Sequence, residues 1–254
     1  MRGLSLLLLV LLLQGCAGQT APAPANKTAD TLKRARLHTE LGSGYYEQNS
    51  LAIALQEFTE AVGIDPDYAP AYIGLGLVYT RLGDDAKAES NLKRATELEP
   101  NNPEARNNYG TFLCGRNRID ESLGEFRAAA GNPLYSTPEN AYLNIGICSL
   151  KKGDAAGAEA AFLKALEYQP LSPQASYQLA RINYQRADYV AARNYLRRGM
   201  INANPSPQAL ALAIEIERAA GDSTAAAGFE TQLKQNFPDS EQARALSSGR
   251  QGDR

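Results

Sequence analysis

A regular internal repeat constrains the fold of this chain more than any other feature of its sequence. A small residue, replaced by isoleucine at the last site, recurs at intervals of 34, 34, 36, 34 and 34 residues: Gly42, Gly76, Gly110, Gly146, Ala180 and Ile214. A period of roughly 20 to 50 residues is typical of chains in which one supersecondary unit is copied and stacked. Because one unit cannot bury its apolar face alone, neighbouring units share a continuous core. The sequence therefore predicts an elongated array of repeats.

The second unit shows the internal pattern most clearly. Its characteristic residues follow in this order: Tyr72, Leu75, Gly76, Tyr79, Ala88, Leu92, Ala95 and Pro100. The order and the unit length resemble the tetratricopeptide repeat, in which two helices pair. We expect an all-α solenoid of about six helix-turn-helix repeats, twelve helices in all, wound as a right-handed superhelix. The array is predicted at residues 35–240, with repeats at 35–68, 69–102, 103–138, 139–172, 173–206 and 207–240, before a frayed tail at 241–254.

Turn and breaker residues follow the same period. A glycine and an aspartate stand together between the two expected helices of three repeats, at Gly83-Asp84, Gly153-Asp154 and Gly221-Asp222. Glycine accepts the left-handed backbone that ends many helices, and aspartate caps the helix that follows. Prolines stop the second helix because they lack the N–H donor, at Pro66, Pro100, Pro170 and Pro238.

The chain begins with the order of residues that marks a secretory signal. Arg2 supplies a positive charge, and the run from Leu4 to Leu13 is apolar except for one serine. These ten residues are fewer than the roughly 20 that a membrane-spanning helix needs. Leu13-Gln14-Gly15-Cys16 resembles the bacterial lipoprotein signal, which implies that residues 1–15 are a signal peptide and that Cys16 is lipidated after cleavage. The alternative is an ordinary secretory signal followed by an incidental cysteine.

The residues after Cys16 are expected to determine which membrane holds the protein and how far the array extends from it. Ala17 stands where an aspartate retains many Gram-negative lipoproteins in the inner membrane, so the resemblance implies the periplasmic face of the outer membrane. Residues 16–34 are rich in alanine, proline, threonine and charge. Such a composition cannot form a core and favours an extended chain. We therefore expect a flexible tether between the lipid and the array.

Two further cysteines, Cys114 and Cys148, fall in the first helices of neighbouring repeats. Such helices pack side by side, so the two sulfur atoms could meet, and an oxidising periplasm would permit a disulfide. The alternative is a pair of buried free thiols, because cysteine packs as a small apolar residue.

The sequence contains no arrangement of residues that indicates catalysis. His38 is the single histidine and falls at a core position of the first repeat, and no nucleophile-elbow, phosphate-loop or H-E-x-x-H motif occurs. The formal net charge of −2 gives no basic excess for nucleic acid. We expect a protein that is no enzyme, has no cofactor or metal, and binds neither nucleic acid nor a small-molecule substrate.

The first helices of the repeats are expected to line a concave groove. In tetratricopeptide arrays, positions 2, 5, 9, 12 and 13 of each repeat face that groove. The resemblance places these residues there: Tyr46, Ile73, Leu77, Asn107, Thr111, Leu143, Ile147, Leu150, Tyr177, Arg181 and Tyr184. This lining is mostly apolar and aromatic, which favours a protein partner. The alternative is that some of these side chains, the leucines above all, turn into the seam between repeats.

The third repeat departs from the plain pattern. It carries Asn-Asn-Tyr-Gly-x-Phe-Leu at residues 107–113, lacks its final proline, and continues through Leu134-Tyr135 into a 36-residue interval. Together with the lipoprotein signal, the tether and the six repeats, these residues resemble the type IV pilus biogenesis lipoproteins, the PilF/PilW pilotin family. The resemblance implies an adaptor on the outer membrane that binds a secretin subunit, or another pilus-assembly protein, and helps the secretin assemble into its ring. The alternative is a tetratricopeptide lipoprotein scaffold for another envelope or cell-wall assembly complex.

Overall fold

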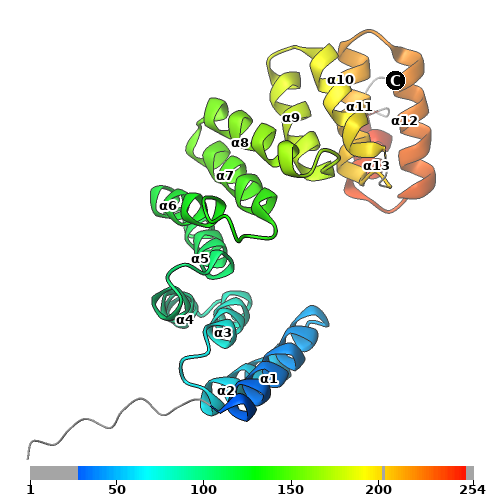
Figure 1. The fold of residues 1–254 in the computed structure, drawn as a ribbon. Coiled ribbons are helices and arrows are strands. Elements are labelled where there is room, and N and C mark those ends of the chain that lie inside the picture. Colours follow the sequence, from blue (N-terminus) through cyan, green and yellow to red (C-terminus); the bar gives the residue numbers. More distant parts are fainter. Residues whose placement is uncertain (1–27, 202–203, 250–254) are drawn as a thin grey trace, which may run out of the picture.

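The computed structural model describes residues 28–201 and 204–249 of the chain (Figure 1). These residues form thirteen α-helices and, within the described ranges, no strand. The helices are α1 (Ala29–Glu47), α2 (Leu51–Ile64), α3 (Ala69–Leu82), α4 (Asp85–Leu98), α5 (Pro103–Gly115), α6 (Ile119–Ala130), α7 (Pro138–Lys152), α8 (Ala155–Tyr168), α9 (Pro173–Gln185), α10 (Tyr189–Met200), α11 (Pro207–Ala219), α12 (Ser223–Asn236) and α13 (Glu241–Gly249).

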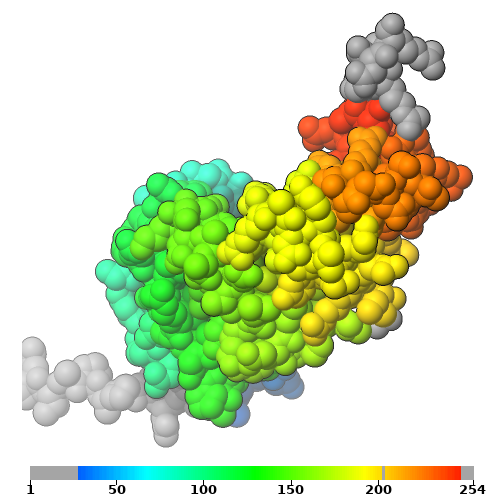
Figure 2. All heavy atoms as spheres, turned by 90° about the horizontal axis from the view of Figure 1, so that it is seen from above, coloured from blue at the N-terminus to red at the C-terminus, as the bar shows by residue number. Residues whose placement is uncertain are grey.

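The first twelve helices pair in chain order and stack into an arc. Each odd-numbered helix packs against the even-numbered helix that follows it, from α1 with α2 to α11 with α12, and each pair then contacts the next. Figure 2 shows the consequence in a space-filling view, where the colours of the chain run in successive bands because repeats contact their neighbours. The prediction of an all-α tetratricopeptide solenoid is confirmed.

Helical structure extends beyond the expected array at both ends. Helix α1 begins at Ala29, so residues 29–34 are helical and do not belong to a tether. The Thr28 hydroxyl accepts a hydrogen bond from the Thr31 amide and caps this helix. The signal peptide, Cys16 and the rest of the expected tether lie outside the described residues.

The expected tail also contains an ordered element. Helix α13 occupies residues 241–249 and buries Ala243 against Leu210, Ile214 and Leu233 of the last repeat. The free end of a solenoid exposes an apolar face, and covering it stabilises the array. The thirteenth helix therefore caps the C-terminal repeat, which the prediction of a frayed tail missed. No described helix is both long and apolar enough to cross a membrane.

The turn inside each repeat has the same backbone geometry. One residue adopts a positive φ in all six turns, at Asn49, Gly83, Asn117, Gly153, Ala187 and Gly221. In four of these turns an aspartate side chain caps the following helix, as when Asp154 Oδ1 accepts from the Gly157 amide at 2.8 Å. The glycine-aspartate pairs thus end one helix and begin the next, as their sequence positions predicted.

Replacing Ala187 by glycine is expected to raise the free energy of unfolding. Ala187 has φ of 59°, where its Cβ crowds the following carbonyl group, whereas glycine avoids this cost. We expect a gain of about 1 kcal/mol in urea unfolding monitored by circular dichroism. The matched control is Gly153→Ala, at φ of 82° in another repeat, which should lose about as much. A stabilising Gly153→Ala would contradict this explanation.

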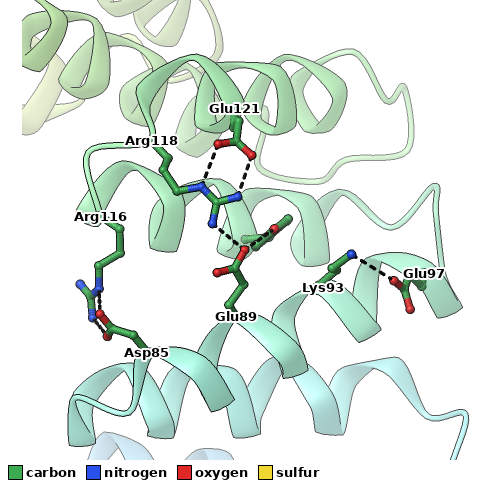
Figure 3. A network of polar contacts seen from close by, with 8 residues as sticks. Asp85, Glu89, Lys93, Glu97, Arg116, Arg118 and Glu121 are labelled. Atoms are coloured by element: carbon green, nitrogen blue, oxygen red, sulfur yellow. Dashed lines mark hydrogen bonds and ion pairs between the residues drawn. The ribbon is translucent and has the colours of Figure 1, made fainter.

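Charged side chains connect the second repeat to the third (Figure 3). Arg118 lies between two carboxylates: its Nη1 donates to Glu89 Oε1 at 2.5 Å, and its Nη2 donates to Glu121 Oε2 at 2.7 Å. The Arg118 hydrogen bond lowers the pKa of Glu121. The Tyr109 hydroxyl donates to the same Glu89 oxygen, which joins helices α4, α5 and α6. Nearby, the Arg116 guanidinium pairs with Asp85.

Candidate functional site

The inner face of the arc is built by the odd-numbered helices. Contacts join α1 with α3, α3 with α5, α5 with α7, and α9 with α11. Residues of α7 and α9 line one hollow together, which connects the two groups of inner helices. In Figure 1 the even-numbered helices α4 and α6 lie outside these inner helices. Equivalent positions of successive repeats therefore lie next to one another on the inner face, and that is where the groove was predicted.

One hollow of about 400 Å³ lies across α5, α7 and α9. Its lining combines four predicted groove residues with further amides: Asn107, Asn140, Leu143, Asn144, Ile147, Gln174, Tyr177 and Gln178. The Asn144 amide donates to Asn107 Oδ1 at 3.0 Å, which connects helices α7 and α5 across the groove floor. Ile147 is the exposed apolar residue here, with 39 % of its surface accessible.

A second hollow of about 440 Å³ continues the groove across α9, α11 and α13. It is lined by Tyr177, Arg181, Tyr184, Gln185, Gln208, Ala211, Leu212, Glu215 and Gln242. Tyr177 borders both hollows, and we call the two hollows together the groove. Burial, and to a smaller extent the Glu215 carboxylate, raises the pKa of Tyr184. The phenol therefore stays protonated and can donate a hydrogen bond to a bound group.

Five of the predicted groove residues do not line these two hollows. Tyr46 lies beneath the Arg81 guanidinium, which is 4.3 Å from the ring centre. Ile73 and Leu150 pack against buried residues of the seams between repeats. Leu77 is half-buried on α3, whereas Thr111 is exposed and receives a 3.4 Å hydrogen bond from Asn144.

Leu143 lines the first hollow but belongs mainly to the core. It is 5 % exposed and packs in a buried cluster with Phe162 and Leu179. This is the alternative that the sequence left open for the leucines. A leucine at this repeat position is drawn into the seam because burying its side chain stabilises the array by about 2 kcal/mol.

The groove lining contains more amide side chains than the sequence predicted. The predicted lining was mostly apolar and aromatic. The prediction missed Asn140, Asn144, Gln174, Gln178 and Gln208, all of which line the hollows. A signal for them exists in the sequence, because three of these amides recur at one repeat position, at residues 140, 174 and 208. The sequence could not show Gln242 in the same way, since it comes from the capping helix α13.

The two cysteines meet across the third and fourth repeats. Cys114 on α5 and Cys148 on α7 have Cα atoms 6.1 Å apart, and the structure joins their sulfur atoms in a disulfide. Both residues are buried, in a cluster that contains Ile119 and Phe126, so the bond lies in the core between these two repeats. His38 is also structural, since its Nδ1 lies 2.7 Å from Glu57 Oε2 on α2. Among the described residues, no group of three or more His, Cys, Asp or Glu side chains could hold a metal ion.

Comparison with known families supports the repeat assignment. A "TPR repeat" model matches residues 42–83, and two "Tetratricopeptide repeat" models match residues 69–102 and 143–207. The matched segments fall on helix pairs of the solenoid.

Comparison with individual proteins narrows the assignment. The chain is 28 % identical to the type IV pilus assembly protein PilF of Pseudomonas aeruginosa over 92 % of each chain. The crystal structure of PilW, described as a widely conserved type IV pilus biogenesis factor, is 33 % identical with a TM-score of 0.75, and the alignment covers 84 % of this chain and 97 % of PilW. A solved structure of Pseudomonas aeruginosa PilF has a TM-score of 0.77 at 25 % identity, covering 87 % and 99 %. The chain therefore belongs to the family of tetratricopeptide-repeat proteins of type IV pilus biogenesis that contains PilW and PilF.

Proposed function

We propose that this protein is an outer-membrane lipoprotein, a pilotin, that binds a secretin subunit and promotes its outer-membrane localisation and its assembly into a multimer. The observation that carries the proposal is the likeness to PilF along nearly the whole chain, combined with an inner face that presents a groove. A protein scaffold of this kind needs no chemistry of its own. It acts by binding the secretin subunit and holding it at the outer membrane.

In the proposed mechanism, one part of the protein provides membrane localisation and another part binds the partner. Lipid on Cys16 keeps the protein at the membrane, and the chain between Cys16 and α1 lets the solenoid reach its partner. The groove holds one secretin subunit while its neighbours arrive. Because every bound subunit then shares one membrane surface, its effective concentration rises and assembly is favoured without new contacts.

Charge placed on the inner face of the arc is expected to prevent secretin assembly. Ile147→Asp and Leu77→Asp put a carboxylate on the inner face, where a bound segment would desolvate it. We expect the heat-resistant secretin multimer to fall at least tenfold on immunoblots, while circular dichroism shows unchanged helical content. Val190→Asp is the matched control, because Val190 is 68 % exposed on α10, a helix of the outer row. Normal multimer levels in both inner-face variants, or a detergent pull-down that recovers cell-wall enzymes in place of secretin, would overturn the proposal.

Loss of the lipidated cysteine is expected to mislocalise a folded protein. Cys16 precedes the first helix, which begins at Ala29, and belongs to none of the repeats, so we expect Cys16→Ser to leave the solenoid folded. Without three fatty chains the protein has no anchor, since each buried CH₂ contributes about 0.8 kcal/mol to membrane binding. We expect the variant to move from the outer-membrane fraction to the soluble periplasm, and the secretin multimer to decrease. Recovery of the variant in the outer membrane would show that another feature anchors the chain.

A further inference from the structure

We propose that the groove recognises the main chain of an extended, weakly charged polypeptide segment through a row of side-chain amides. The inference rests on the proposed function, in which that segment belongs to the secretin subunit. The amide row consists of Asn140 and Asn144 on α7, Gln174 and Gln178 on α9, and Gln208 on α11. Each of these residues lines one of the two hollows of the groove.

The amide row follows the geometry of the solenoid. Asn140, Gln174 and Gln208 lie 34 residues apart, near the N-terminal ends of three successive inner helices. Asn144 and Gln178 lie four residues further along α7 and α9, on the same helix faces. The spacing repeats because the helices repeat, so the amides present themselves at regular steps along the groove. A polypeptide backbone is the ligand that also presents its hydrogen-bonding groups at regular steps.

The three amides near the N-terminal ends of the helices can form hydrogen bonds with a ligand. Asn140, Gln174 and Gln208 are exposed, and their amide groups make no hydrogen bond to another described residue. A primary amide carries both a donor and an acceptor, as each peptide unit does. Asn144 is oriented by its bond to Asn107, and Gln178 Oε1 accepts from the Arg181 guanidinium at 3.2 Å. These two contacts fix the amides of Asn144 and Gln178, while the three amides near the helix N-termini remain open to a partner.

The character of the lining selects the conformation and charge of the occupant. The hollow across α5, α7 and α9 contains no charged side chain among its lining residues, so a charged segment would lose hydration there without compensation. The second hollow has one charged residue of each sign, Arg181 and Glu215, and so favours no net charge in the occupant. A helical segment would have its backbone groups already paired and would need a broad apolar face. The apolar side chains of this hollow are few, and Leu143 is almost wholly buried. An extended segment uses the amides and needs only occasional apolar anchors, such as Ile147.

The test uses peptides of 15 residues that tile the periplasmic part of the secretin from the same genome. The full-length lipidated protein, in detergent, is titrated against each peptide by fluorescence anisotropy. We expect binding by peptides of low net charge, and at least tenfold weaker binding by the double variant Gln174→Leu/Gln208→Leu. Gln56→Leu makes the same change at an exposed site on α2, in the outer row, and should bind as the wild type does. N-methylation of alternate backbone amides in the best peptide should weaken binding by a similar factor.

The outcomes separate this inference from the proposed function. If the amide variant and the N-methylated peptide bind as tightly as their parents, or if the bound peptide gains a helical circular dichroism signal, the main-chain inference is wrong. Intact secretin that still binds the double variant in a pull-down would then leave the pilotin function standing. Intact secretin that binds neither the wild type nor the variant would overturn both.

Discussion

Removal of the disulfide between Cys114 and Cys148 is expected to lower the free energy of unfolding by about 4 kcal/mol. The bond closes a loop with a sequence separation of 34 residues, and closing such a loop restricts the unfolded chain. The double variant Cys114→Ala/Cys148→Ala removes the bond and leaves small apolar side chains in the buried site. We expect its urea midpoint to fall by the amount that reduction causes in the wild type, and reduction should not affect the variant.

The effect should be local as well as large. In a linear array each repeat is stabilised by its neighbours, so a weakened junction opens without unfolding the far end. Amide hydrogen exchange should therefore accelerate in α5 to α8 and stay unchanged in α11 and α12. Thiol counting in denatured protein checks the premise, because Cys114 and Cys148 should react only after reduction. The prediction would be wrong if both thiols reacted before reduction and the double variant had the same urea midpoint as the wild type.

Periodic features of the chain were predictable because each residue type has one physical reason to stand at its place. Gly83, Gly153 and Gly221 recur where the backbone needs a positive φ, and the structure gives them φ of 76°, 82° and 83°. The same turn forms at Ala187 without such a residue. Local preference therefore predicts the turn where it is present, and the packing of the repeat imposes the turn where it is absent.

Features that depend on the ends of the array were not predictable in the same way. Helix α13 is polar in sequence, and its helical form depends on the apolar end of the last repeat, against which Ala243 packs. Its position in turn brings Gln242 into the second hollow. The packing of α13 on the last repeat could not be predicted from the repeat pattern, because α13 is not itself a copy of the repeat.

The direction of individual apolar side chains was also not predictable from the sequence. Leu134 and Tyr135 were read together as part of one motif, but Leu134 is 87 % exposed whereas Tyr135 is buried against Ala129 and Ala141. The same uncertainty separates Leu143, which is core, from Ile147, which faces the groove. A residue's place in a repeat gives its approximate face. Whether an apolar side chain on that face turns inward depends on the space that its neighbours leave.

The contact between the small residue of one helix and the large residue of the next leads to the second large prediction. A Cβ atom on Gly146 would lie 2.4 Å from Phe162 Cε1, and two further ring atoms would lie within 2.7 Å. Phe162 is fully buried and cannot move aside freely. We expect Gly146→Ala to lower the free energy of unfolding by about 2 kcal/mol, even though alanine is the better helix former. The matched control is Gly124→Ala, on an exposed face with no atom within 4 Å of its Cβ, which should gain about 1 kcal/mol.

A compensating change shows whether this steric contact is the cause. In the fifth repeat the equivalent pair is Ala180 with Leu196, and both are buried in one cluster. The double variant Gly146→Ala/Phe162→Leu copies that pair into the fourth repeat, so the added methyl group meets a smaller side chain. We expect a favourable coupling energy of at least about 1 kcal/mol between the two changes in urea unfolding. If their effects simply add, the small residues of the repeat are not set by the large residues that face them, and the period would need another physical origin.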